Sequence, residues 1–313
     1  MTTPKIENHR VTNNNQGVAM RPPAKLNISL VVFGPREDGY HDLHTVMGTI
    51  NLYDDLHLKF ADKPGIHLYC TGLECPANGD NLTYKAAELL ARHVRLEPAV
   101  DIYLHKRIPA GGGLGGASSD AAACLLGLNR LWSLNLPQEE LELIASQLGS
   151  DVPFFLNGPV ALCTGRGEII QKLPHRCKRT ILLIIPDIHI STAQVYRNYT
   201  FDENKVNEDI RRARYFLCRG DLDGLLIQGI NSLTEVTMSL SEALQNLRHR
   251  LNDMGIAEVH MTGSGSCLFA VSESMGEITA WELEIKRQNI AQPLQVSFYD
   301  HDEIFLENHH ADF

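Results

Sequence analysis

The sequence lacks the signals that define several classes of protein. No apolar run reaches the ~18 residues that a membrane span requires, and the first 20 residues contain no apolar core of a secretory signal. The formal net charge is −10, so the composition offers no basic surface to a nucleic acid, and the short cluster Arg211, Arg212 and Arg214 is typical of a solvated helix face. We therefore expect a cytoplasmic protein with no membrane partner and no nucleic-acid partner.

Paired motifs for metal or redox chemistry are missing as well. The seven cysteines are odd in number and none belongs to a CxxC motif, and the fourteen histidines contain no HExxH. Several cysteines, such as Cys124 and Cys267, lie in apolar runs. We expect free, mostly buried thiols in a reducing compartment and no structural zinc site.

What remains is an ordinary globular composition. The 313 residues, 43% hydrophobic and 21% charged, are enough for two domains. Strand-like and helix-like patterns mix without strict βαβ repetition, which indicates an α+β fold. The polar, Asn-rich residues 1–20 predict a disordered tail, and breaks in the pattern between residues 158 and 180 predict domains at 21–170 and 171–313.

A glycine-dense loop stands directly before a predicted helix of small residues. Five of the six residues 111–116 are glycine, and Ser118, Ser119 and Asp120 follow. Successive N–H groups of such a loop converge on an anion, and a helix start capped by one of these three side chains attracts phosphate. The sequence predicts a phosphate-binding loop; the alternative is glycines packed closely against a strand.

Two familiar nucleotide motifs do not account for this loop. Gly111, Gly113 and Gly116 formally match GxGxxG, but the next predicted element is a helix and not a strand ending in an acidic residue, which argues against a dinucleotide-binding oxidoreductase. The loop ends in GGASSD and lacks the GK[ST] of a Walker A motif.

Three further features suit phosphoryl transfer, which needs a cation near the transferred group and often a carboxylate near the acceptor hydroxyl. Lys25 and Asn27 share the polar face of a predicted strand. Asp151 follows a predicted helix, and a second glycine turn occupies residues 262–266. Taken singly, these would be an exposed lysine, an ordinary helix cap and a hairpin turn.

Taken together, four segments resemble the GHMP kinase superfamily in order and spacing: residues 23–45, 108–122, 148–156 and 261–270. The first, in which Lys-Leu-Asn is followed by Asp-Gly-Tyr-His, is similar to the branch whose alcohol substrate carries a cytidine diphosphate. The resemblance implies a two-lobed α+β fold with a ribosomal-protein-like N-terminal lobe and a ferredoxin-like C-terminal lobe. It also implies ATP and Mg²⁺ as cofactors, a small-molecule substrate, and a monomer or homodimer.

The resemblance also implies roles for individual residues. Lys25 and Asp151 would be catalytic: Lys25 would lower the pKa of the acceptor hydroxyl and Asp151 would accept or attract its proton. Tyr40 and Tyr196 would stack on the two faces of cytosine, although phenylalanine is more usual at Tyr196. The implied cofactor-binding residues are Asn81, Lys106, Pro109, Ala110, Gly111, Gly112, Gly113, Leu114, Gly115, Gly116, Ala117, Ser118 and Ser119. The implied substrate-binding residues are Asn27, Tyr40, His41, Thr192, Tyr196, Gly263, Ser264 and Gly265.

Some questions stay open in the sequence. Asp120 would repel a phosphate unless it caps the helix or holds Mg²⁺, and nothing in the sequence assigns metal ligands. Residues 200–240 match the superfamily poorly. A homoserine or mevalonate kinase, and a non-catalytic sensor on the same fold, are the competing functions; the Asp-Gly-Tyr-His loop argues against the first and the intact pair of Lys25 and Asp151 against the second.

Overall fold

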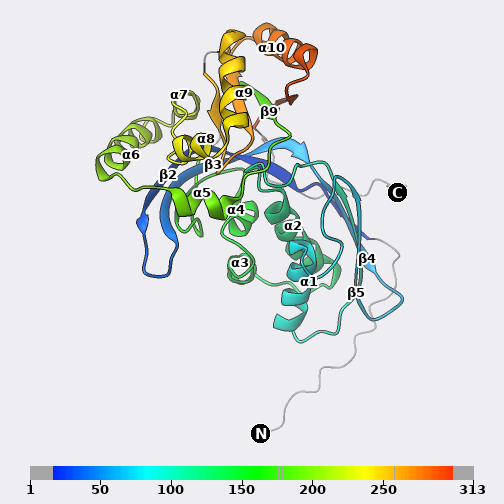
Figure 1. The fold of residues 1–313 in the computed structure, drawn as a ribbon. Helices are drawn as coiled ribbons and strands as arrows, with labels where there is room; N and C mark the ends of the chain where they lie inside the picture. Colours follow the sequence, from blue (N-terminus) through cyan, green and yellow to red (C-terminus); the bar gives the residue numbers. More distant parts are fainter. Residues whose placement is uncertain (1–16, 175–176, 178, 257, 299–313) are drawn as a thin grey trace.

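A computed structural model of the protein describes residues 17–174, 177, 179–256 and 258–298 (Figure 1). The described residues form two lobes on three four-stranded sheets, so the predicted two-lobed α+β class is confirmed. The long hairpin of β2 and β3 runs through the middle of the molecule, with α2 and α4 on one side and α6 and α7 on the other (Figure 1). None of the described helices combines the length and apolar character that crossing a membrane demands.

In the N-terminal lobe, the described residues form two sheets and four helices. One sheet has the order β1-β4-β6-β5 and the other the order β2-β3-β7-β8. Its strands are β1 (Val18–Met20), β2 (Pro23–Pro35), β3 (His41–Tyr53), β4 (Asp55–Phe60), β5 (Gly65–Gly72), β6 (Ala99–Lys106), β7 (Val160–Gly165) and β8 (Ile169–Lys172). Its helices are α1 (Leu82–His93), α2 (Gly116–Leu131), α3 (Gln138–Ser146) and α4 (Val152–Asn157).

Small residues on α2 allow this helix to lie close to the sheet that contains β4. Ala121, Ala122 and Ala123 are fully buried, and a Cβ atom on Gly127 would lie 2.5 Å from the Leu58 side chain. Because the helix packs this closely, its N-terminus is held in a fixed place at the lobe's edge.

The C-terminal lobe follows a β-α-β-β-α-β plan. All strand pairs in its sheet are antiparallel, in the order β10-β11-β9-β12, which is the ferredoxin-like arrangement. The strands are β9 (Thr180–Ile185), β10 (His260–Met261), β11 (Leu268–Ser272) and β12 (Gln292–Val296). The helices are α5 (Thr192–Asn198), α6 (Glu203–Leu217), α7 (Leu222–Ile227), α8 (Thr234–Leu240), α9 (Glu242–Asp253) and α10 (Met275–Gln288).

The prediction of a disordered tail at residues 1–20 is wrong for the last three of these residues. Val18–Met20 form β1, which pairs antiparallel with β4. The side chains of Val18 and Met20 are buried in the core, and this burial outweighs the polar character of the preceding residues. Residues 1–16 lie outside the described part of the chain.

The predicted domain boundary after residue 170 also needs a correction. It cuts β8, which runs from Ile169 to Lys172 and pairs with β7 of the N-terminal lobe. The lobe therefore ends after β8. Of the predicted C-terminal domain, residues 175–176, 178, 257 and 299–313 are outside the described residues.

Candidate active site

Two cavities meet at the glycine loop. The large cavity has a volume of about 990 Å³ and is lined by residues of both lobes, and the small cavity, of about 330 Å³, lies on the other side of the loop beside the start of α2. Gly113 and Gly115 line both cavities. The loop is therefore the wall between them.

The glycine loop is clamped between β2 and the second glycine turn. Gly111, Gly113 and Gly115 have φ angles of 72°, 76° and 71°, a region that favours glycine. A Cβ atom on Gly113 would lie 2.4 Å from the carbonyl oxygen of Thr262, and the backbone N–H of Lys25 donates to the Leu114 carbonyl at 2.9 Å. The loop packs closely, as the alternative interpretation expected, and it also presents its main chain to a cavity; phosphate binding there stays a prediction.

The start of α2 differs from the predicted one. The cap is Gly115, in the left-handed conformation and without a side-chain hydrogen bond, so none of Ser118, Ser119 and Asp120 is the N-cap. The first amides of a helix have no partner within the helix. Here they belong to Gly116, Ala117 and Ser118, which line the small cavity, so the positive end of α2 faces that space.

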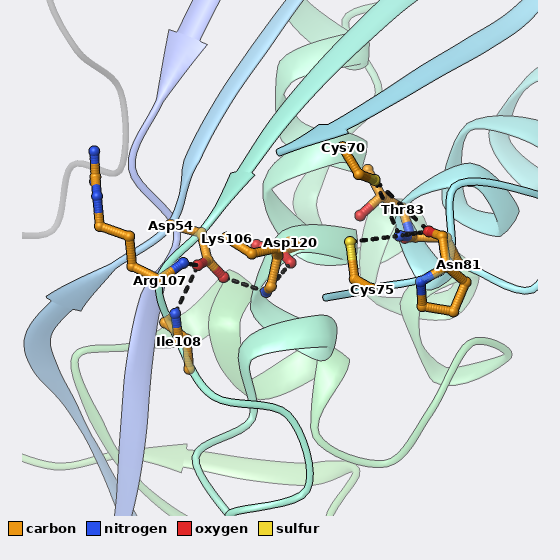
Figure 2. Close-up of polar contacts among 10 residues, drawn as sticks. Asp54, Cys70, Cys75, Asn81, Thr83, Lys106, Arg107, Ile108 and Asp120 are labelled. Carbon is orange, nitrogen blue, oxygen red and sulfur yellow. Dashed lines mark hydrogen bonds and ion pairs between the residues drawn. The ribbon is translucent and has the colours of Figure 1, made fainter. Parts of the chain in front are cut away.

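A buried ion cluster supports the entry to the loop (Figure 2). The Lys106 ammonium group contacts both Asp54 and Asp120, and the Asp120 Oδ2 atom lies 2.6 Å from Nζ. Asp54 Oδ1 accepts hydrogen bonds from the backbone N–H groups of Arg107 (2.5 Å) and Ile108 (2.8 Å). The cluster therefore ties the end of β6 to α2 and fixes where the loop begins.

The charges in this cluster are strongly coupled. Burial raises the pKa of Asp120 to about 8; Asp54 adds to this effect and Lys106 opposes it. Burial works against the charge of Lys106, but the two carboxylates outweigh it and raise the pKa of the lysine. Asp120 thus answers the question left by the sequence, because its carboxylate faces an ammonium group and not a bare phosphate site.

Lys106 and Asn81, which the resemblance implies as cofactor-binding residues outside the loop, line the small cavity, but their side chains are bonded to other parts of the protein. Lys106 is committed to the two carboxylates. Asn81 is the N-cap of α1: its Oδ1 accepts from the Thr83 N–H at 2.8 Å, and its Nδ2 donates to the Pro76 carbonyl at 2.7 Å. Of the implied cofactor-binding set, Gly112 and Ser119 do not line this cavity, because both are buried behind the loop.

The large cavity brings Lys25 and Asp151 together from two distant parts of the chain. Lys25 Nζ lies 3.6 Å from Asp151 Oδ2 and donates to Asn27 Oδ1 at 2.6 Å. Asn27 Nδ2 donates in turn to Thr45 Oγ1 at 2.8 Å. Lys25 is only 3% exposed, so the polar face of β2 points into the cavity and not to bulk solvent.

Asp151 stands at the N-cap position of α4 but does not act as a side-chain cap. It makes no capping hydrogen bond, and its side chain is 38% exposed in the large cavity beside Lys25. The residues after it form the short helix α4. The helix aims the carboxylate at the cavity and leaves it able to accept a proton.

Aromatic residues line the outer part of the large cavity. His41 Nδ1 is 2.7 Å from the Phe33 carbonyl, which leaves Nε2 as an acceptor, and its ring lies 5.7 Å from that of Tyr196. Tyr40 is 54% exposed, with the Arg166 guanidinium 4.9 Å from its ring centre. Burial, together with the nearby Asp151 charge, raises the pKa of Tyr196, so its hydroxyl stays protonated.

Of the remaining substrate-binding residues that the resemblance implies, three line the large cavity and one does not. Thr192 Oγ1 and Ser264 Oγ are 2.8 Å apart, and both line the large cavity with Gly263. Gly265 does not line it, because it packs against Met261 and Thr237 behind the turn. Sequence reasoning missed four further residues, none with a sequence signal of its own: Asp54, which contacts Lys106, and Thr45, Arg166 and Tyr199, which line the large cavity.

Comparison with known proteins agrees with this arrangement. A family profile for the GHMP kinases N terminal domain matches residues 81–159, and one for the GHMP kinases C terminal matches residues 213–286. A homoserine kinase from Cytophaga hutchinsonii shares the fold, with a TM-score of 0.70 at 16% identity over 91% of this chain and 96% of its own. The fold and the two-cavity site define a GHMP kinase, an enzyme class that uses ATP.

Closer relatives narrow the class. The 4-diphosphocytidyl-2-C-methyl-D-erythritol kinase of Listeria monocytogenes is 39% identical over 254 residues, 81% of this chain and 86% of its own. That of Enterococcus faecalis is 37% identical over 81% of this chain and 89% of its own. A solved 4-(cytidine 5'-diphospho)-2C-methyl-D-erythritol kinase has a TM-score of 0.69 at 31% identity, over 89% of this chain and 98% of its own. The chain belongs to the 4-diphosphocytidyl-2-C-methyl-D-erythritol kinase family.

Proposed function

We propose that this protein transfers the γ-phosphoryl group of ATP to the 2-hydroxyl of 4-diphosphocytidyl-2-C-methyl-D-erythritol, a step in non-mevalonate isoprenoid precursor biosynthesis. The observation that carries the proposal is the pair of Lys25 and Asp151, 3.6 Å apart in the large cavity and separated from the small cavity only by the glycine loop. A donor in the small cavity and an acceptor in the large one would meet across that loop.

The chemistry at the acceptor follows from the two side chains. The acceptor oxygen attacks the γ-phosphorus, its proton passes to a carboxylate oxygen of Asp151, and the bond from phosphorus to the bridging oxygen of ADP breaks. Lys25, held by Asn27, supplies positive charge beside the developing alkoxide. Burial of Lys25 strengthens this attraction, because little water screens it.

The donor's phosphates fit the other side of the loop. Main-chain N–H groups of residues 111–118 and the positive end of α2 offer donors and favourable charge to an anion. Pro109 and Ala110 line the same cavity at the start of the loop. This fit supports ATP as the phosphoryl donor there.

The residues at the start of α2 also suit Mg²⁺. Ser119 Oγ and Asp120 Oδ1 are buried oxygen atoms without a hydrogen-bond partner among the described residues, and oxygen is the ligand that Mg²⁺ prefers. Of the two, Asp120 lines the small cavity, so its carboxylate would hold the ion together with phosphate oxygens, while Ser119 lies buried behind the loop. When bound, Mg²⁺ would neutralise phosphate charge during transfer.

The aromatic end of the large cavity favours a cytidine substrate over homoserine or mevalonate. Tyr40 and Tyr196 offer ring faces, and His41 offers an acceptor nitrogen to an exocyclic amino group. A small acyclic acid would leave this part of the cavity without a role. The fit supports a cytosine ring between the two tyrosines, with Thr192 and Ser264 as polar contacts near the acceptor.

The test is a competition between the three alcohols. With ATP and Mg²⁺, we expect ADP release only with the cytidyl substrate, and we expect cytidine diphosphate to inhibit it. Turnover of homoserine or mevalonate, without inhibition by cytidine diphosphate, would overturn the substrate assignment. Binding of ATP with no turnover of any alcohol would favour the sensor.

The remaining expectations concern the protein in the cell. We propose that it works in the cytoplasm as a monomer or homodimer on small molecules, without a nucleic-acid partner. The net charge of −10 supports the last point. Size-exclusion chromatography with light scattering tests the assembly, and a trimer or larger species would contradict it.

A further inference from the structure

Two cysteines share one hydrogen-bond donor in the wall of the small cavity (Figure 2). The Sγ atoms of Cys70, on β5, and Cys75, in the following loop, each lie 3.9 Å from Asn81 Nδ2. The shared nitrogen limits the distance between the two sulfurs to less than about 8 Å. Burial, and after it the neighbouring Cys75 thiol, raise the pKa of Cys70 to about 12.

No other cysteine in the described part of the chain has this setting. Cys124, Cys163 and Cys267 are fully buried, Cys218 is exposed on the far lobe, and the half-buried Cys177 donates to Asp223 Oδ1 and not to a site beside another thiol. Cys70 and Cys75 are both half-buried, and Cys75 itself lines the small cavity. This pair therefore combines a neighbouring thiol with access from the cavity.

Asn81 links the pair to the cavity wall. Its Nδ2 donates to the Pro76 carbonyl at 2.7 Å, while its Oδ1 caps α1 through the Thr83 N–H. The Cys70 thiol also donates to the Pro76 carbonyl, at 3.6 Å. A disulfide requires the sulfurs to approach to about 2.05 Å, so forming one would move the Cys75–Pro76 segment and disturb the Asn81 contacts.

We propose that Cys70 and Cys75 form an oxidation site in the wall of the small cavity, where a peroxide joins them in a disulfide and weakens nucleotide binding. Cys75 sulfur attacks a peroxide oxygen and gives a sulfenic acid and one water. Cys70 sulfur then displaces the hydroxyl oxygen, which leaves as a second water with the Cys70 proton. Two thiols are oxidised and one peroxide is reduced. The effect on nucleotide rests on the proposed function, but formation of the bond does not.

The test compares reduced and hydrogen peroxide-treated protein. In the wild type we expect a mass loss of about 2 Da that a thiol reductant reverses, a Cys70–Cys75 cross-linked peptide, and a loss of affinity for a fluorescent ATP analogue on the order of tenfold. Cys75→Ser, and independently Cys70→Ala, should keep their affinity after peroxide. Cys218→Ser, which leaves the pair intact, should respond like the wild type.

The outcomes separate this proposal from the proposed function. A reduced protein that binds no ATP analogue contradicts the function. A reduced protein that binds it normally, yet forms no Cys70–Cys75 bond or loses no affinity when the bond forms, overturns this proposal alone. An equal loss of affinity in Cys75→Ser would place the damage elsewhere and also overturn it.

Discussion

At the scale of single residues, Lys25 and Asp151 in the large cavity differ in how firmly their side chains are held. Lys25 is fixed by Asn27, and Asn27 by Thr45, so the ammonium group cannot turn away from Asp151 without breaking a buried chain of hydrogen bonds. Asp151 has no comparable tether, since it makes no capping bond at α4. The lysine is thus the fixed member of the pair and the aspartate the adaptable one.

Replacing Asp151 by asparagine keeps the shape but removes the proton acceptor. We expect Asp151→Asn to lower kcat by about 10²–10⁴-fold, the usual contribution of a general base. The KM for ATP should change little, because the loop and the small cavity are untouched. Steady-state kinetics measures both, with Asp253→Asn on the exposed end of α9 as a control. A variant that keeps most of its kcat would exclude Asp151 as the base.

The buried carboxylate of Asp120 predicts an unusual pH dependence of stability. Its pKa rises from 3.8 to about 8 on folding, so the folded protein binds more protons than the unfolded chain between these values. This group's stabilising contribution is present at low pH and is lost as pH rises through that window, at no more than about 1.4 kcal/mol per pH unit.

Asp120→Asn should remove this dependence. We expect the difference in free energy of unfolding between wild type and variant to shift in favour of the variant from about pH 5 to about pH 8. Urea denaturation across this range measures it, with Asp253→Asn as the surface control. A difference that stays constant, or moves in the opposite direction, would show that Asp120 is ionised throughout.

Sequence reasoning selected Lys25 and Asp151, which the structure brings to 3.6 Å from each other, because both residues lie in short motifs. Lys25 and Asn27 are two residues apart on one strand, and Asp151 directly precedes an apolar run. Asp54 was missed, because its structural role depends on the Lys106 side chain, 52 residues away in the sequence, and on Asp120, which contacts the same lysine. Long-range pairing of charges has no local signature.

At the scale of elements, the glycine loop requires glycine for two reasons, its backbone conformation and its close contacts with neighbouring residues. Gly113 has a positive φ, and its missing side chain also makes room for the Thr262 carbonyl of the other lobe. Gly255 has a similar φ, +82°, but nothing lies within 4 Å of where its Cβ would be. Substituting each glycine in turn therefore distinguishes the cost of the left-handed backbone, which both positions share, from the cost of a steric clash, which arises only at Gly113.

Gly113→Ala and Gly255→Ala form a matched pair. Both should lose about 1–2 kcal/mol from the left-handed backbone, but only Gly113→Ala should lose more, together with most of its ATP affinity, because the loop must move. Thermal denaturation and nucleotide titration measure the two effects. Equal losses in the pair would mean that contact with Thr262 does not position the loop.

Helix caps differ in how local their signature is. Asn81 caps α1 through a local contact, since its side chain meets the Thr83 amide two residues on. The cap of α2 was wrong because three polar candidates follow a glycine that can itself adopt the cap conformation. Strand β1 was missed because three residues are too few to show a period, and only pairing with β4 stabilises them.

At the scale of the whole molecule, strand β2 joins the lobes. Its Leu30 donates to the Ile230 carbonyl at 2.7 Å and accepts from the Ser232 N–H at 2.9 Å. Between them, Asn231 Nδ2 donates to the carbonyls of Met261 and Gly263, both at 2.9 Å. The second glycine turn is therefore held by the same segment that pairs with β2.

This sharing predicts that the two lobes unfold together. Asn231→Ala should lower the stability by about 1–3 kcal/mol, the cost of leaving buried carbonyls without donors, while scanning calorimetry still shows one transition. Ser239→Ala, at an exposed site on α8, is the control. Two resolved transitions in the wild type would mean that the lobes are independent units.

The partition between the cavities has a consequence for how this enzyme can diverge. Where Gly113 and Gly115 separate the two spaces, the barrier is bare main chain, so no side chain there is available for substitution. Under the proposed function, preference for the acceptor alcohol can change through Tyr40, Thr192 and Tyr196 in the large cavity, and preference for the donor through residues that line the small cavity, each without disturbing the other. Proteins that diverge from this one can therefore change the preference for one substrate at a time, while the glycine loop between the two cavities stays the same.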